Sequence, residues 1–136
     1  MATKNFICYN RVIPFKGFRC INLFGVLFAR KEQGKLSKEV IQHEYIHTLQ
    51  MRELGYLPFY ILYLLEWLLR VIFTRSFKKA YYNISFEQEA YSFQNYTEYP
   101  TWREKWKWCQ FLNAKEAFSL GVTLFIIGIL MIWIFV

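Results

Sequence analysis

Residues 37–55 read SKEVIQHEYIHTLQMRELG and predict the central helix of this chain. Ser37 is a favourable N-cap residue, and Glu39 lies in the first turn, where a negative charge stabilises the helix dipole. Gly55 is a typical stop signal just beyond the end of a helix. We therefore expect an α-helix over residues 37–54.

This helix carries an H-E-x-x-H motif, His43-Glu44-Tyr45-Ile46-His47. Residues four positions apart share a helix face, so both imidazoles can bind one metal ion while Glu44 points at a metal-bound water. Imidazole suits Zn²⁺, the metal lowers the pKa of its water, and a carboxylate accepts the proton when that water attacks a carbonyl. The chain has only these two histidines, so the motif rarely arises by chance. The alternative is a pair of ordinary polar residues near an interface.

The composition excludes several other kinds of active site. All ten acidic residues are glutamates, so a Ser-His-Asp triad cannot form. Di-iron carboxylate sites and histidine-rich desaturase sites need further histidines, which this chain lacks. Cys8, Cys20 and Cys109 show no paired spacing, which argues against a disulfide framework or a cysteine-based zinc site and for free thiols in a reducing compartment.

A catalytic zinc usually has three protein ligands and one water, and glutamate is the remaining hard ligand type. Residues 86–91 read FEQEAY and offer two candidates, Glu87 and Glu89, on a helix that we expect over residues 84–96. The offset of two residues puts these carboxylates on nearly opposite sides of that helix, so only one of them can face the metal.

The two motifs resemble the pattern of gluzincin membrane metallopeptidases, such as CAAX prenyl endopeptidases and the related heat-shock membrane peptidases. Those families follow H-E-x-x-H with a later helix bearing E-x-x-A-D, whose first Glu is the third zinc ligand. The resemblance implies that His43, His47 and Glu87 bind Zn²⁺ and that Glu44 is the base. Tyr91 stands where the families have Asp, and a tyrosine can replace that carboxylate as a hydrogen-bonding group. The whole chain also resembles small uncharacterised bacterial membrane proteins.

Residues 118–136 contain no charge, and nineteen residues form a helix about 28 Å long, close to the hydrocarbon thickness of a bilayer. We expect a C-terminal transmembrane helix there. Lys105, Lys107 and Lys115 precede it, which favours a cytoplasmic body and an active site on the cytoplasmic side of the cell membrane. Tryptophan alternates with basic residues over 101–115, a pattern typical of a membrane interface rather than of nucleic-acid binding. No cleavable signal peptide is visible at the N-terminus.

A second apolar stretch, residues 56–73, is broken only by Glu66 and Arg70, which can pair at i and i+4. This pairing gives Glu66 a structural role, although it is a further candidate metal ligand. If the stretch crossed the bilayer once, the histidines and Glu87 would lie on opposite sides of a layer about 30 Å thick. We therefore expect it to lie in the interface or to form one arm of a hairpin that dips into the membrane.

The N-terminal region is rich in strand-forming residues over 6–13 and 19–28, and Pro14 to Gly17 between them have turn chemistry. We expect a β-hairpin over residues 6–28, which can align an extended peptide by strand addition. The expected fold is thus a single, mainly α, membrane-integral domain over residues 1–136. It is a membrane-associated helical bundle with a small N-terminal β-hairpin and a zincin-like active-site helix.

The sequence predicts a membrane-embedded zinc metallopeptidase that hydrolyses a peptide or amide bond near the membrane surface. We expect membrane lipid as a partner, a peptide or membrane protein as the substrate, and no nucleic acid. The alternative is a membrane scaffold or adaptor with a structural or vestigial zinc site. Glu44 separates the two, because a Gln in its place abolishes turnover only in an enzyme. The sequence predicts neither the oligomeric state nor the oxyanion stabiliser.

Overall fold

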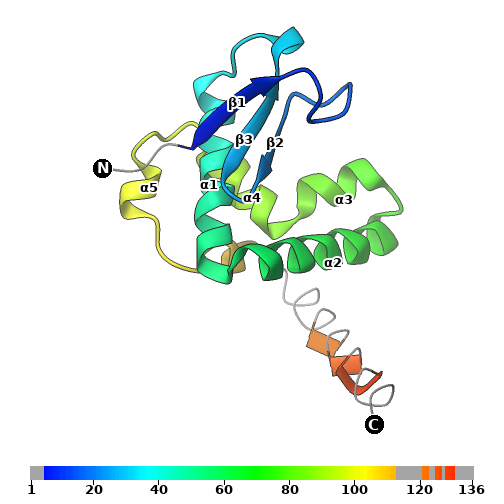
Figure 1. Ribbon diagram of the computed structural model, residues 1–136. Helices are drawn as coiled ribbons and strands as arrows, with labels where there is room; N and C mark the ends of the chain where they lie inside the picture. Colours follow the sequence, from blue (N-terminus) through cyan, green and yellow to red (C-terminus); the bar gives the residue numbers. More distant parts are fainter. Residues whose placement is uncertain (1–4, 113–120, 123–124, 127, 131–136) are drawn as a thin grey trace.

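The computed structural model describes residues 5–112, 121–122, 125–126 and 128–130 of the chain. It is mostly helical, with a small three-stranded sheet at its N-terminal end (Figure 1). The prediction of a mainly α fold is confirmed, while the arrangement as a membrane bundle stays a prediction.

The sheet consists of β1 (Phe6–Asn10), β2 (Cys20–Leu23) and β3 (Val26–Arg30), in the spatial order β1-β3-β2. Strands β2 and β3 form an antiparallel hairpin, whereas β1 pairs with β3 in parallel. The expected hairpin between residues 6–13 and 19–28 is therefore wrong in its pairing. The segment expected to form its second strand holds a complete hairpin of its own.

The hairpin turn at Phe24 and Gly25 is the reason for this difference. Their φ angles are +53° and +86°, and two positive φ values are what a two-residue hairpin turn requires. A Cβ atom on Gly25 would lie 3.3 Å from Cγ2 of Thr48, so the turn also packs closely against the long helix that follows. A phenylalanine is rare in this conformation. Its apolar side chain gives the turn a sequence that is typical of a strand.

Helix α1 (Lys38–Leu54) has the limits that its sequence predicts. The hydroxyl of Ser37 accepts a hydrogen bond from the backbone N–H of Val40, and the helix stops at Gly55. The sheet lies against one side of this helix, and a pair of helices begins at its C-terminal end and runs away from it (Figure 1). The sheet also contacts the first of these two helices, because the backbone N–H of Phe24 donates to the hydroxyl of Tyr60 at 2.9 Å.

The two helices of this pair are α2 (Tyr56–Thr74) and α3 (Phe77–Asn83), and α3 folds back along α2 (Figure 1). Helix α3 was not expected from the sequence, because residues 74–79, which include its first turn, are mostly polar and basic. Its N-terminus is capped by the hydroxyl of Ser76, which accepts a hydrogen bond from the backbone N–H of Lys79. This return of the chain brings the following helix, α4 (Ser85–Phe93), against α1.

The start of α4 is held by the Glu66 side chain of α2. The backbone N–H and the hydroxyl of Ser85 both donate to the Glu66 carboxylate, at 2.7 and 2.6 Å. Arg70 donates to the same carboxylate at 2.7 and 2.9 Å, which confirms the predicted Glu66–Arg70 pair. Glu66 is 4% exposed, so this carboxylate joins two helices inside the protein.

The remaining elements are η1 (Lys31–Gln33), α5 (Tyr99–Trp102) and η2 (Lys107–Phe111). Within the described residues, α2 has the length and apolar composition to cross a membrane, a property that core helices share. The predicted transmembrane helix over 118–136 lies largely outside the described residues. Its described members, 121–122, 125–126 and 128–130, are helical.

The Glu66 carboxylate is expected to be a major source of stability. Replacing Glu66 with Ala removes the acceptor that Arg70 and Ser85 share, and breaking a buried ion pair costs about 3–5 kcal/mol. Chemical unfolding of the full chain in detergent micelles, followed by circular dichroism, measures this loss. The control is Glu104→Ala, because the Glu104 side chain is 75% exposed and its loss should cost less than about 0.5 kcal/mol. Equal stabilities of the two variants would contradict this role.

Candidate metal centre

Three side chains from two helices meet at one point inside the structure. His43 and His47 come from α1 and Glu87 from α4, and their exposed fractions are 7%, 6% and 3%. The Nε2 atoms of the two histidines lie 3.1 Å apart. Nε2 of His43 lies 3.2 Å from Oε2 of Glu87, and Nε2 of His47 lies 3.2 Å from Oε1. The structure thus brings together the three residues that the resemblance implies as ligands.

One ligand atom from each residue can be chosen so that all three lie within 4.8 Å of one another, which is close enough for one metal ion to bind them after a small adjustment. Zinc binds nitrogen and oxygen ligands at about 2.0–2.1 Å, which puts tetrahedral ligand atoms about 3.3 Å from one another. Within the described residues, Oε2 of Glu87 is buried and receives no hydrogen bond, although His43 lies beside it. A buried carboxylate oxygen needs a partner, and a cation among the three ligand atoms would supply one. Zinc is one of several divalent ions that this donor set suits.

The charges of the cluster are strongly coupled. Burial opposes the charged form of His47, but the carboxylates of Glu87 and Glu44 and the hydrogen bond with Gln50 together outweigh burial and raise the pKa of His47 to about 9. Burial likewise opposes the charged form of Glu87, yet the two histidines hold its pKa well below the usual range. Without a metal, the site therefore holds a proton on His47 at neutral pH, and a cation can replace that proton.

Gln50 fixes the orientation of His47. Its side-chain amide donates to the Glu89 carboxylate at 3.0 Å and to the backbone carbonyl of Phe86 at 3.1 Å. Its carbonyl oxygen is therefore the atom that lies 2.8 Å from Nδ1 of His47, and this nitrogen must be the donor. Once the imidazole has lost its extra proton, the lone pair is on Nε2 of His47 and can bind a metal, which is how outer hydrogen bonds commonly prepare a ligating histidine.

Glu89, the alternative ligand, points away from the cluster. It is fully buried, and its carboxylate accepts hydrogen bonds from Tyr99 at 2.7 Å and from Arg103 at 3.1 Å. Arg103 also donates to Glu53 of α1 at 2.7 Å. The Glu89 carboxylate therefore links α4 to α1 through Arg103. It supports the site through its hydrogen bond with Gln50 instead of binding a metal.

The ring of Tyr91 packs edge to face on the imidazole of His43, with the ring centroids 4.5 Å apart. Nδ1 of His43 is buried and has no hydrogen-bond partner within the described residues. Tyr91 thus supports the histidine by ring packing, where the resembled families have a carboxylate. A closer polar contact comes from Tyr63 of α2, whose hydroxyl donates to Oε1 of Glu87 at 2.7 Å.

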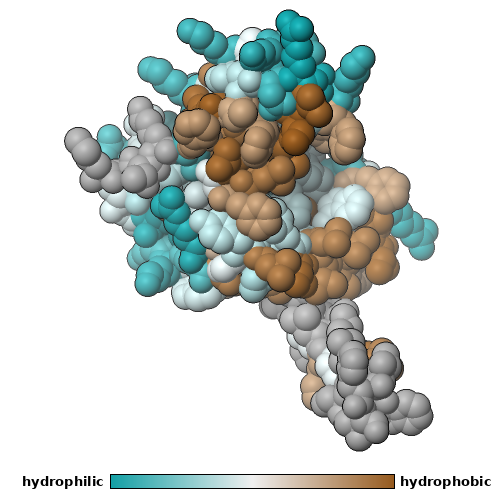
Figure 2. Space-filling model, in the orientation of Figure 1, coloured by the Kyte–Doolittle hydropathy of each residue, from teal (hydrophilic) through white to brown (hydrophobic). Residues whose placement is uncertain are grey.

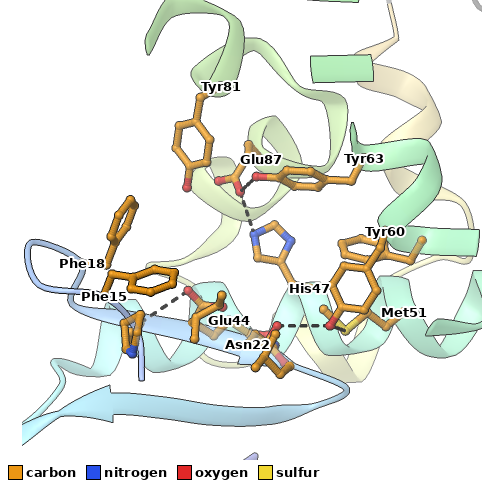
Figure 3. A pocket seen from close by; sticks show the side chains of 15 residues that line it. Phe15, Phe18, Asn22, Glu44, His47, Met51, Tyr60, Tyr63, Tyr81 and Glu87 are labelled. Atoms are coloured by element: carbon orange, nitrogen blue, oxygen red, sulfur yellow. Dashed lines mark hydrogen bonds and ion pairs between the residues drawn. The ribbon is translucent and has the colours of Figure 1, made fainter. Parts of the chain in front are cut away.

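Glu44 lies beside this cluster on the wall of a cavity of about 440 Å³ that also exposes His47 and Glu87 (Figure 3). The thiol of Cys20 lies 3.6 Å from Oε1 of Glu44 and donates to it. Burial and the nearby Glu44 charge raise the pKa of Cys20 to about 12, so the thiol keeps its proton. The cavity walls are mostly apolar side chains and include Phe15, Phe18, Ile21, Tyr60, Tyr63 and Tyr81.

Sequence analysis did not identify Cys20, Gln50 or Tyr63 as parts of the site. Gln50 lies three residues after His47 on the same helix face, which is a signal that the sequence does contain. Cys20 and Tyr63 reach the site from β2 and α2, and only the tertiary fold places them there.

No family model, no curated protein and no solved structure matches this chain. The resemblance to gluzincin membrane metallopeptidases consequently rests on the two short motifs.

Metal analysis of the purified full chain tests the ligand set. His47→Ala and Glu87→Ala should each lose bound zinc, because either change leaves only two protein ligands. Glu98→Ala is the control, since Glu98 is exposed and lies outside the cluster. Zinc retained by Glu87→Ala would place the third ligand elsewhere.

The pKa of His47 predicts how metal affinity depends on pH. Below about pH 9, binding must displace a proton from this imidazole, so affinity should rise about tenfold for each pH unit from pH 6.5 upwards. Competition with a chromophoric chelator at a series of pH values measures this slope. An affinity that does not change over the range would show that His47 is already neutral without metal.

Proposed function

We propose that this chain is a zinc-dependent hydrolase that cleaves a peptide or amide bond near a membrane surface. The observation that carries the proposal is the meeting of His43, His47 and Glu87 at one point, on the wall of the cavity that Glu44 also lines. A metal site of three protein ligands that leaves one position open is the arrangement of catalytic zinc.

The residues around the cavity have separable roles in this reaction. When bound, Zn²⁺ would polarise the scissile carbonyl and acidify a water molecule at the site. Glu44 accepts the proton of the attacking water and passes it to the leaving amine, so the carboxylate is regenerated after each turnover. The hydrogen bond from Cys20 holds the Glu44 carboxylate toward the cavity. Tyr63 holds Glu87 in its position as a ligand.

The edge of the sheet favours a peptide as the substrate. Among the strands that the structure describes, β2 pairs with β3 alone, and its residues Cys20 to Leu23 line the same cavity as Glu44. Asn22 of this strand donates to the backbone carbonyl of Glu44 at 2.8 Å and to the hydroxyl of Thr48 at 2.9 Å. An extended chain that adds to the edge of β2 opposite β3 would therefore be held at a fixed distance from the base, and it would replace the hydrogen bond that the Tyr60 hydroxyl donates to the backbone carbonyl of Asn22 at 3.2 Å.

A location at the cell membrane is supported by two apolar segments. Residues 118–136 carry no charge, and α2 has the length and composition of a membrane helix. The basic residues that precede 118–136 favour a site on the cytoplasmic side. In this setting the expected substrates are membrane proteins and other peptides that reside in or on the lipid.

Glu44→Gln tests the proposal, because it keeps the shape of the side chain and removes its basicity. We expect zinc content and thermal unfolding to stay unchanged while hydrolysis falls by about 10²- to 10⁴-fold. The assay is cleavage of a library of internally quenched peptides by the full chain in detergent micelles. The matched control, Glu98→Gln, changes an exposed glutamate and should retain full activity. Zinc-loaded wild type that cleaves nothing would instead favour a membrane scaffold with a structural zinc site.

A further inference from the structure

One side of the structure carries large apolar side chains that are exposed to solvent. Figure 2 shows apolar surface over the strands with their connecting loop and over α2, all on the one face drawn. We call this surface the apolar face. It comprises the following exposed residues: Val12, Phe15, Phe18, Phe24, Leu57, Ile61, Leu64, Leu68 and Ile72.

The helical part of the apolar face runs along the whole of α2. Its members, residues 57, 61, 64, 68 and 72, are spaced by three or four positions and therefore form one row along the helix. The row is about 22 Å long. The opposite side of α2 holds Phe59, Glu66 and Arg70, which are all buried. Apolar exposure on α2 is thus concentrated on one side, along its full length.

The ionic cluster of Glu66 shows how such a helix can lie in lipid. If α2 crossed a bilayer, Glu66, close to the middle of the helix, would come to the depth where ionisable groups are most costly. The metal centre would lie near the same depth, because Tyr63 contacts Glu87 directly. If α2 instead lies parallel to the membrane, its apolar row enters the lipid and the ionic groups stay on the protein side.

The loop at the mouth of the cavity has the same chemistry. Phe15 and Phe18 line the cavity, yet they are 85% and 64% exposed, so they form its rim. Tyr60 and Tyr63 of α2 line the same cavity, so its mouth lies between the loop and α2. The loop part of the apolar face therefore lies at the entrance to the metal centre, while α2 lines the cavity with residues outside its apolar row.

Basic residues adjoin both apolar parts. The net charge of the chain is +7, and exposed cations lie beside the loop and at the end of α2. These cations are Arg11, Lys16, Arg19, Arg75, Lys78 and Lys79. Apolar side chains bordered by lysine and arginine fit the boundary between headgroups and acyl chains of an anionic bilayer.

The C-terminal segment would keep this surface close to a membrane. Leu112 packs against the buried cluster that includes Phe59 of α2. The uncharged stretch 118–136 starts six residues after Leu112, and six residues span at most about 20 Å. A membrane anchor in that stretch would therefore hold the protein within about 20 Å of the bilayer.

We propose that the apolar face binds an anionic lipid bilayer, with α2 lying in the membrane plane and the mouth of the cavity opening onto the lipid surface. Substrates would then reach Glu44 along the membrane rather than from bulk solvent. This orientation concerns the surface alone and does not depend on the metal or on turnover.

Nitroxide depth measurements test the orientation. The full chain, with Cys8, Cys20 and Cys109 changed to Ser, carries one spin label at Leu57→Cys, Leu64→Cys or Ile72→Cys. The protein is reconstituted into vesicles of phosphatidylcholine and phosphatidylglycerol, and accessibility to oxygen and to a nickel chelate gives the depth of each label. We expect the three labels at equal depth, about 5–10 Å into the boundary region.

Glu98→Cys is the matched control, because this exposed residue precedes α5, away from the apolar face, and its label should stay in water. A label at Leu64→Cys that lies much deeper than those at Leu57→Cys and Ile72→Cys would mean that α2 crosses the bilayer. Labels that all behave like the control would mean that the face does not touch lipid. Either result overturns the proposal.

The loop gives a second readout that does not involve α2. A label at Phe15→Cys should enter the lipid of the mixed vesicles and lose most of its depth in vesicles of phosphatidylcholine alone, because Lys16 and Arg19 then lack anionic partners. A depth that is the same in both vesicles would contradict the role of anionic lipid.

Discussion

The structure depends on a buried carboxylate held between two imidazoles. Glu87 is 3% exposed, and a buried charge without a partner is far more costly than a paired one. His47 supplies the partner charge when no metal is bound, and a divalent cation would replace its proton. To place Glu87 beside the histidines in the middle of α1, the chain must turn back from the C-terminal end of that helix. The hairpin of α2 and α3 makes this turn.

Helix α4 is fixed by two further carboxylates, which is why Glu87 points where it does. At its first residue, Ser85 is bound by Glu66 of α2. Two residues after Glu87, Glu89 accepts a hydrogen bond from Gln50 of α1. Glu87 lies between these two attachments, so its side chain has little freedom to point away from the histidines. The same Gln50 also orients His47, so one residue positions ligands on both helices.

Features encoded within one helix were predictable from the sequence. The limits of α1 follow from Ser37 and Gly55, and the pairing of the two histidines follows from their spacing. The choice of Glu87 over Glu89 came from the family resemblance, because both lie on one short helix and only their tertiary partners separate them. The strand order was not predictable, since β1 joins β3 by a long-range parallel pairing and Phe24 adopts a conformation that its type rarely shows.

The central claim is that one zinc ion is bound by two imidazoles and one carboxylate. X-ray absorption at the zinc edge of the purified full chain tests it most directly, because the method identifies the atoms around the metal. The account predicts only nitrogen and oxygen neighbours at about 2.0–2.1 Å, with the scattering pattern of two histidines. A sulfur neighbour at about 2.3 Å would instead place a cysteine on the metal and contradict the account.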